Sequence, residues 1–445
     1  MSLAAVQRLH AIMPSVRSDL KDLVRIPSVG ADPARADDVR RSADAVASLL
    51  RDAGFAEVDV VSAGGGPAVI ANHPAPPGAP TVLLYAHHDV QPTGDPAAWT
   101  SPPFEPTERG DRLYGRGAAD DKAGIAAHLA AFRAWEGNPP VGVTVFVEGE
   151  EESGSASLGA LLDTYRDRLA ADVIVIADSS NWDIGTPALT TTLRGLVDCV
   201  VEVETLKHAV HSGMWGGVFP DALAVLVRLL STLHDDSGEV AVSGLHVGEA
   251  ADVVYPEDRL IAESGVLEGV EQIGSGSVVD RLWAKPAISV IGIDAPTVAD
   301  SSNTLVPRAR AKISLRIAPG SDTDASMDAL VEHLRTHAPW GARVTVTPND
   351  RGDAYAIDAQ GPAYEAARAA FREAWEGVEP IDMGVGGSIP FIAEFAGRYP
   401  DAAVLVTGVE DPDTRAHGID EGLHLGEFKR VCLAETLLLG RLADA

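Results

Sequence analysis

The sequence has 445 residues, 46% hydrophobic and 22% charged, which is the composition of a globular protein too long for one ordinary core. We therefore expect two well-packed domains. Asp and Glu number 65 against 35 for Lys and Arg, and the net charge of −30 argues against binding to nucleic acid or to anionic membranes. Two cysteines, Cys199 and Cys432, cannot form a disulfide framework, and we expect both to be reduced and buried.

The chain opens with two predicted amphipathic helices. Apolar residues recur at helical spacing from Leu9 to Leu23, and residues 37–50 give a second helix that ends near Gly54. Charges scattered through the first thirty residues differ from a signal peptide, and no later stretch is typical of a membrane span. We therefore expect a cytoplasmic protein. Two short strands, 58–61 and 68–72, follow the helices.

An apolar strand that ends in polar residues is the central feature of the sequence. Residues 82–90 read VLLYAHHDV, and such a continuous apolar run is typical of a strand buried on both faces of a parallel sheet. Ligands gather at the carboxyl edge of these sheets. Since side chains alternate along a strand, His87 and Asp89 point to one side and His88 to the other. His87 is therefore the candidate ligand.

Two further apolar strands also end in acids. After a predicted surface loop at 95–111, a glycine-rich segment leads into a helix at 125–135, but it fails as a dinucleotide fingerprint because Asp120 stands where the third glycine belongs. The strand at 141–147 is followed by Glu148, Glu150, Glu151 and Glu152, and the strand at 173–177 is followed by Asp178. Three buried strands thus terminate in acid or imidazole groups.

The composition changes near Thr190, and the pattern of the first 189 residues returns near residue 353. The predicted elements between these points are a strand at 191–205, a helix at 220–233, a strand at 304–317, a helix at 324–337 and a strand at 342–347. This order is typical of a small antiparallel sheet with helices on one face, while the segment 235–286 stays ambiguous. Helices at 361–375, 389–395 and 425–442 and a strand at 403–407 follow.

These elements predict an α/β fold in two parts. Residues 1–189 and 353–445 form a catalytic domain with a mixed, mainly parallel sheet flanked by helices. Residues 190–352 form a smaller inserted α+β domain, which we expect to serve as a lid and a dimerisation domain.

Polar residues at the strand ends form one candidate site. Its members are His87, Asp89, Asp120, Glu151, Glu152, Asp178 and, much later, His417. Carboxylates gathered at one sheet edge repel each other unless a cation lies between them, and mixed imidazole and carboxylate ligands suit Zn²⁺ or a similar divalent ion. A single member is more often a solvated acid or a satisfied histidine, so the set carries the prediction.

At these residues the sequence resembles the di-zinc metallopeptidases that include carnosinases, aminoacylases, glutamate carboxypeptidases and succinyl-diaminopimelate desuccinylases. The shared motifs, in order, are His87-x-Asp89, Gly115-Arg116-Gly117 with Asp120-Asp121-Lys122, Glu151-Glu152-Ser153-Gly154-Ser155, Asp178, His211-Ser212-Gly213 and His417 with Glu421. The sequence is most similar to carnosinase-like dipeptidases, through HHDVQP at 87–92, EESGS at 151–155 and GGSIP at 386–390.

The resemblance implies a role for each member of the site. Asp120 would bridge two metals, His87 and Asp178 would complete one, and Glu152 and His417 the other. Glu151 would be the general base for a water activated between the metals, and Asp89 would orient His87. The implied cofactors are two divalent ions, zinc first, with manganese or cobalt as alternatives. A cis peptide bond between Asp120 and Asp121 is also implied, and Glu150 is expected to be a surface acid.

In the inserted domain, the resemblance implies that His211 reaches the active site of a partner subunit and hydrogen-bonds the developing oxyanion. Arg316 would bind both oxygens of a substrate carboxylate through its planar guanidinium, and the less favoured interpretation is an exposed surface arginine on a strand. Asn303 and Ser388 are further candidate contacts. We therefore expect a homodimer with active sites completed in trans.

The predicted function is metal-dependent hydrolysis of the peptide bond in dipeptides or small peptides with a free carboxylate. N-acyl amino acid deacylation is the alternative, because it uses the same metals with a different pocket. A metal-binding protein without turnover ranks lower, since Glu151 and all five ligand positions are filled. The sequence departs from the carnosinase-like pattern at Gly384 and Val385, where charged residues usually stand, and this leaves the substrate preference open.

Overall fold

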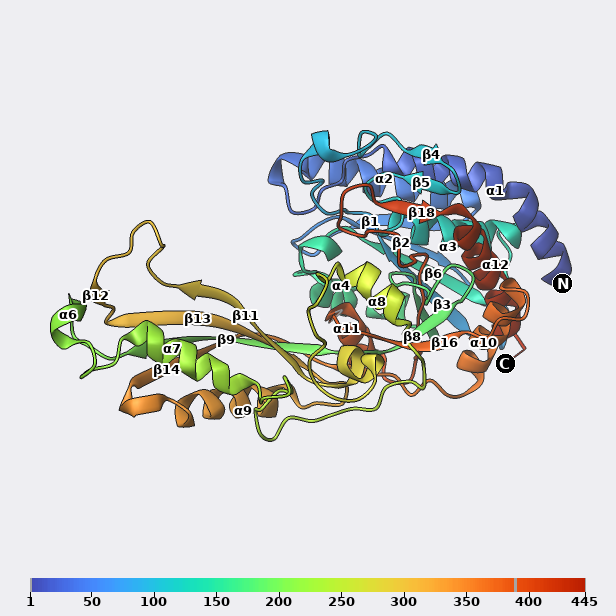
Figure 1. Ribbon diagram of the computed structural model, residues 1–445. Coiled ribbons are helices and arrows are strands. Elements are labelled where there is room, and N and C mark those ends of the chain that lie inside the picture. Colours follow the sequence, from blue (N-terminus) through green and yellow to red (C-terminus); the bar gives the residue numbers. More distant parts are fainter. Residues whose placement is uncertain (1, 388–389, 445) are drawn as a thin grey trace. The chain divides into compact units, whose positions relative to one another are not determined.

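The computed structural model describes residues 2–387 and 390–444 and divides into two compact units (Figure 1). The first unit comprises Met1–Thr191, Ile357–Met383 and Pro390–Ala445, and the second comprises Thr192–Ala356 with Gly384–Ile389. Sequence patterns gave no indication that the short segment at 384–389 groups with the second unit.

A large mixed sheet forms the centre of the first unit. Among the described residues it has nine strands in the order β1-β2-β6-β3-β7-β17-β8-β15, with β16 beside β8. Their bounds are β1 Glu57–Val61, β2 Ala68–His73, β3 Thr81–His87, β6 Gly142–Glu148, β7 Val173–Ile176, β8 Ala188–Leu193, β15 Tyr355–Ala356, β16 Ile381–Val385 and β17 Ala403–Val406. The predicted fold class is confirmed, and its parallel pairings include those of β3 with β6 and β7 and of β17 with β7.

Helices cover both faces of this sheet, which explains the continuous apolar run of β3. The helices of the first unit are α1 Ser2–Val24, α2 Ala36–Ala53, α3 Lys122–Ala134, α4 Leu158–Thr164, α5 Arg166–Leu169, α10 Pro362–Ala374, α11 Pro390–Arg398 and α12 Leu425–Leu442. Val82 and Leu84 share one core cluster with residues of α1, α2, α3, α10 and α12. Tyr85, on the opposite face, stacks on Phe391 of α11. The α2 helix ends at Gly54 in a left-handed conformation, as predicted.

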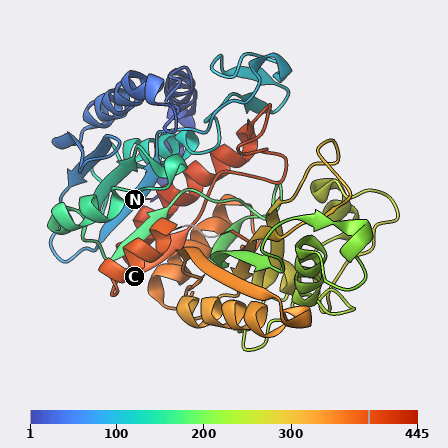
Figure 2. The same ribbon diagram turned by 90° about the vertical axis from the view of Figure 1, so that its left-hand side faces the viewer.

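The second unit contains an antiparallel sheet in the order β11-β13-β9-β14. Its elements are β9 Gly195–Glu204, β10 Val210–His211, α6 Ser212–Trp215, α7 Ala222–Leu230, α8 Glu257–Ser264, β11 Ala287–Asp294, β12 Thr304–Leu305, β13 Arg308–Ile317, α9 Thr323–Thr336 and β14 Arg343–Gly352. Alternate residues of β9 and β13 pack against α7 and α9 in one core cluster. Figure 2 shows α9, in orange, beside the neighbouring strand β14.

Three details of the second unit differ from the sequence prediction. The strand predicted at 191–205 is two strands, because β8 pairs within the large sheet and the chain leaves it at Arg194 before β9 begins. The strand predicted at 304–317 breaks at Pro307, whose nitrogen cannot donate to a ladder. The ambiguous segment is mostly irregular. The strand β11 directly after it was missed, and it is an edge strand whose last six residues are all exposed.

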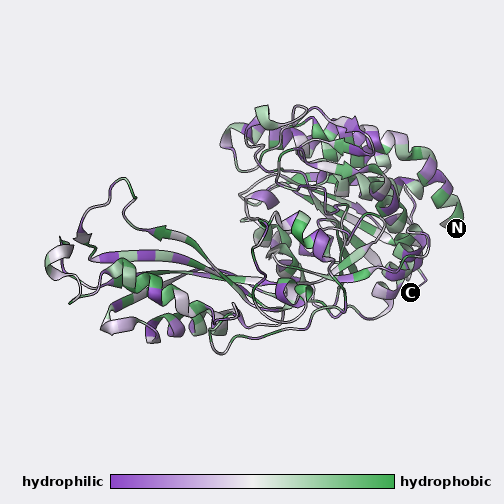
Figure 3. Cartoon of the chain, viewed as in Figure 1, coloured by the Kyte–Doolittle hydropathy of each residue, from purple (hydrophilic) through white to green (hydrophobic). Residues whose placement is uncertain are grey.

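Hydropathy is distributed as expected for a chain with two cores. Figure 3 shows hydrophobic residues along the strands of the large sheet and mixed residues along the surrounding helices. Within the described residues, no helix is both long and apolar enough to cross a bilayer. The cytoplasmic location stays a prediction. Cys199 and Cys432 are both free and buried, as predicted.

Candidate metal centre

The candidate ligands lie at the carboxyl ends of the parallel strands of the first unit. His87 is the last residue of β3, Glu152 lies in the turn that follows β6, and Asp178 lies two residues beyond β7. Asp120 lies two residues before the start of α3, and His417 lies in the loop between β17 and β18 (Gly422–His424). Because parallel strands end at the same edge, five residues far apart in the sequence meet there.

Interatomic distances divide these residues into two sets that share Asp120. His87 Nε2 lies 3.1 Å from Asp120 Oδ1 and 3.8 Å from Asp178 Oδ1. His417 Nε2 lies 3.0 Å from Asp120 Oδ2 and 3.2 Å from Glu152 Oε2. Each oxygen of the Asp120 carboxylate therefore faces a different histidine, which is the arrangement needed for a bridging ligand.

The electrostatics of the cluster fit bound cations. Burial raises the pKa of Glu151 to about 9, with a further rise from the carboxylates of Asp178 and Glu152. Hydrogen bonds to Asp120 and Glu152 raise the pKa of His417 to about 10. Neighbouring carboxylates in this cluster make one another's ionisation less favourable. A divalent cation bound among them would stabilise the ionised forms. Nitrogen and carboxylate donors together fit Zn²⁺, Mn²⁺ or Co²⁺.

Comparisons with known proteins identify the family. Residues 83–439 match the model of "Peptidase family M20/M25/M40". The chain belongs to this family. It is a metal-dependent peptidase, and the resemblance found in its motifs is confirmed.

Several relatives of this M20 peptidase are dipeptidases. The chain is 38% identical over 368 residues to a cysteinylglycine-S-conjugate dipeptidase of Corynebacterium striatum, covering 81% of each chain. It is 30% identical over 363 residues to the human beta-Ala-His dipeptidase, covering 76% of this chain and 70% of that protein.

Solved structures show the same fold. The dipeptidase Dug1p of Saccharomyces cerevisiae has a TM-score of 0.79 at 23% identity, over 100% of this chain and 99% of that one. Human carnosine dipeptidase 1 has a TM-score of 0.76 at 25% identity, over 100% of both chains.

Asp89 fixes the backbone of the turn that carries Glu151 and Glu152 in the M20 site. Its Oδ1 accepts a hydrogen bond from the Glu151 backbone N–H at 3.1 Å, and its Oδ2 accepts one from the Glu152 N–H at 3.2 Å. Toward His87, the carboxylate lies 3.6 Å from Nδ1, whereas the backbone carbonyl of Asp89 lies at 3.1 Å. Orientation of His87 by Asp89 therefore involves the carbonyl more directly than the carboxylate that we expected.

Two positioning residues, Gln91 and Glu421, belong to the shared motifs, but the sequence analysis assigned them no role. Gln91 Nε2 donates to Glu152 Oε2 at 2.7 Å. Glu421, fully buried, accepts the backbone N–H groups of Ala119 and Asp120 at 2.9 and 3.2 Å and the Arg116 guanidinium at 2.7 Å. It thus ties the Asp120 loop to the His417 loop. Its place four residues after His417 was the only signal in the sequence.

The neighbouring polar residues have structural partners. His88 Nε2 bonds the Pro67 carbonyl at 2.8 Å, and burial lowers the pKa of His88 to about 4, in agreement with its position outside the site. Glu150 is not the surface acid that we expected, because its half-buried carboxylate accepts N–H groups of Gly66 and Ser157 at 2.7 and 2.5 Å. The peptide bond between Asp120 and Asp121 is cis, as predicted.

The predicted substrate contacts belong to the second unit. Exposed His211 lies on β10, which pairs with β12, and the Ser212 N–H donates to the Asn303 carbonyl at 3.0 Å, so His211 and Asn303 share one short ribbon. Arg316 is half-buried on β13. Ser388 lies outside the described residues. The roles assigned to these four residues stay predictions.

Proposed function

We propose that this M20 peptidase hydrolyses the peptide bond of dipeptides that carry a free carboxylate, using two divalent metal ions, with zinc as the first candidate. The observation that carries the proposal is the division of the Asp120 carboxylate between two histidines, at 3.1 and 3.0 Å. His87 and Asp178 would hold one ion, and Glu152 and His417 the other. Bound ions of this kind lower the pKa of water toward neutrality and polarise a carbonyl group.

Glu151 is the proposed general base. Its Oε2 lies 3.9 Å from His87 Nε2, and among the described residues its carboxylate makes no hydrogen bond. The backbone of Glu151 is fixed by Asp89, whereas the side chain is free to approach a water molecule. Such a carboxylate can take a proton from the attacking water and deliver it to the nitrogen of the leaving amine.

The dipeptide substrate rests on the relatives. Proteins with 38% and 30% identity over most of this chain are named for cysteinylglycine conjugates and for beta-Ala-His. Both substrate types end in a free carboxylate, for which Arg316 is the proposed ligand. His211 is the proposed donor to the oxyanion, acting from the second subunit of a homodimer.

A turnover screen tests the proposal. The zinc-loaded chain is incubated with a panel of dipeptides and with N-acyl amino acids of the same residues, and free amino acids are quantified. We expect dipeptide cleavage that stops on chelation and returns with added zinc. If only the N-acyl amino acids are cleaved, deacylation replaces dipeptide hydrolysis as the activity of this protein. Turnover that survives chelation would contradict the metal mechanism.

A further inference from the structure

A glycine-rich loop packs against the turn that carries Glu151 and Glu152. The loop comprises residues 62–67 and joins β1 to β2, and the turn comprises residues 149–157 and follows β6. Because β2 pairs with β6 in antiparallel orientation, the start of β2 and the end of β6 lie at the same edge of the sheet. The loop and the turn are therefore neighbours within the first unit.

Glu150 links the loop to the turn through both oxygens of its carboxylate. Oε2 accepts a hydrogen bond from the Gly66 N–H at 2.7 Å, and Oε1 accepts one from the Ser157 N–H at 2.5 Å. The backbone carbonyl of Glu150 also accepts the N–H groups of Ser153 and Ser155, at 3.2 and 3.0 Å. One residue thus closes the turn and fastens it to a loop 84 residues earlier in the chain.

Two glycines of the loop permit this contact. A side chain at Gly65 would place its Cβ 2.0 Å from Glu150 Oε2, and one at Gly66 would place its Cβ 2.5 Å from the Gly149 carbonyl oxygen. Neither glycine has a positive φ, so the backbone there would accept another residue. Gly64 differs, because its φ of +98° favours glycine, while no described atom lies within 4 Å of a Cβ placed there. Gly65 and Gly66 are therefore required by the close approach to the turn.

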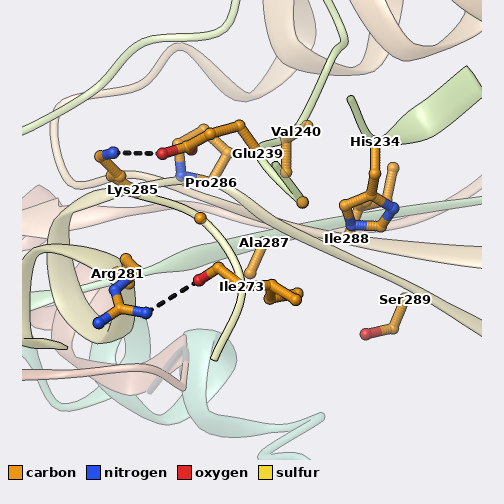
Figure 4. Close-up of a pocket in the computed structure, with 12 residues that line it drawn as sticks. His234, Glu239, Val240, Ile273, Arg281, Lys285, Pro286, Ala287, Ile288 and Ser289 are labelled. Carbon is orange, nitrogen blue, oxygen red and sulfur yellow. Dashed lines mark hydrogen bonds and ion pairs between the residues drawn. The ribbon is translucent and has the colours of Figure 1, made fainter. Parts of the chain in front are cut away.

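The charge of Glu150 holds backbone groups and no side chain. In the described part of the chain it forms no ion pair, and both donors to its carboxylate are backbone N–H groups. Glu239 differs, because in the wall of a pocket of about 230 Å³ in the second unit it accepts from the Lys285 ammonium at 2.7 Å (Figure 4). Hydrogen bonds to an ionised carboxylate are stronger than those between neutral groups. Glu150 therefore stabilises the conformation of two backbone segments.

The Glu151 side chain depends on this backbone for its position. Asp89 accepts the N–H groups of Glu151 and Glu152, and Glu150 fixes the residues on either side of them. The Glu151 carboxylate makes no hydrogen bond among the described residues, so the turn alone directs it. A displacement of a reacting group by about 1 Å can lower a rate by ~10²-fold.

We propose that the hydrogen bonds of Glu150 with Gly66 and Ser157 form a second clamp on the catalytic turn, which makes Glu150 a positioning residue for Glu151. The inference rests on the proposed role of Glu151 as general base. Both oxygens of Glu150 are occupied by backbone donors, which separates its role from that of a base. Loss of the clamp would let Glu151 move away from the attacking water while the metal ligands and substrate contacts stay in place.

Hydrogen exchange tests the clamp without turnover. Amide exchange in segments 62–67 and 150–157 is measured by mass spectrometry for zinc-loaded wild type, Glu150→Gln and Glu239→Gln. The amide nitrogen of glutamine cannot accept, so one backbone donor loses its partner in Glu150→Gln. We expect exchange in both segments to be ~10- to 100-fold faster in Glu150→Gln and unchanged in Glu239→Gln. Unchanged exchange in Glu150→Gln would overturn the clamp.

Steady-state kinetics at saturating zinc test the positioning role. The substrate is any member of the dipeptide and N-acyl amino acid panel that wild type cleaves, since the base acts on both classes. Glu150→Gln should lower kcat by ~10- to 100-fold and change KM by less than about threefold, whereas Glu239→Gln should change neither. Faster exchange with unchanged kcat, or a loss through KM alone, would overturn the positioning role. Cleavage of N-acyl amino acids alone would overturn the proposed substrate and leave this role standing.

A double-mutant cycle tests whether Gly65 acts through Glu150. Gly65→Ala should lower kcat about as much as Glu150→Gln, because the new Cβ displaces the carboxylate. In the Glu150→Ala background that carboxylate is absent, so Gly65→Ala should change kcat by no more than about twofold. Losses that multiply in the double variant would overturn the link between the loop and Glu150.

Discussion

Replacing Glu421 by glutamine should weaken both the fold and the metal centre. The Glu421 carboxylate and the Arg116 guanidinium are 0% and 1% exposed and lie 2.7 Å apart, and the carboxylate also accepts three backbone N–H groups from Gly117, Ala119 and Asp120. The amide nitrogen of glutamine cannot accept, so several donors lose their partner and Arg116 is left as a buried charge. Breaking such a pair costs about 3 to 5 kcal/mol of unfolding free energy. Because the unfolding entropy grows with chain length, this loss should lower the unfolding temperature by roughly 3 to 9 °C.

The assay combines unfolding with zinc titration. Because Glu421 fixes the loop that carries Asp120, Glu421→Gln should also lower zinc affinity by ~10- to 100-fold. The matched control is Glu379→Gln, whose ion pair with Arg372 has side chains 64% and 47% exposed and is therefore screened by solvent, so its loss should leave stability almost unchanged. Equal stability losses in the two variants, or unchanged zinc affinity in Glu421→Gln, would refute this reasoning.

Three further predictions concern the base, the dimer and pH. Glu151→Gln should lower activity by ~10² to 10⁴ with zinc content unchanged, measured by steady-state assay and metal analysis; nearly full activity would point to another base. Mixing inactive His211→Ala and Glu151→Gln subunits should restore activity if His211 acts in trans, and inactivity after verified exchange would exclude that. Burial lowers the pKa of His128, but Glu435, 2.9 Å away, raises it to a net value above normal. The difference in unfolding free energy between wild type and Glu435→Gln should therefore be largest below about pH 6.5. It should fall as the pH rises through the folded-state pKa of His128, and a pH-independent difference would contradict this.

Residues with a local signature could be assigned from the sequence. The apolar run of β3 predicts a buried strand because both its faces are covered, and Gly54 predicts the end of α2 because it adopts a left-handed conformation there. The ligand candidates at strand ends could be grouped for the same reason, since parallel strands bring their carboxyl ends to one edge.

Residues whose role depends on distant partners could not be assigned. Glu421 acts on a loop more than 300 residues earlier in the chain, and its acidity alone predicts only a solvated surface group. The resemblance separated Glu150 from the candidate base Glu151, but its contacts with Gly66 and Ser157 are visible only in the folded chain.

Anomalous diffraction from crystals of the zinc-loaded protein, recorded near the zinc absorption edge, tests the central claim most directly. The two-ion proposal predicts two anomalous peaks on either side of the Asp120 carboxylate, ~3.5 to 4 Å apart, one beside His87 and one beside His417. A single peak, no peak, or peaks remote from Asp120 would contradict it.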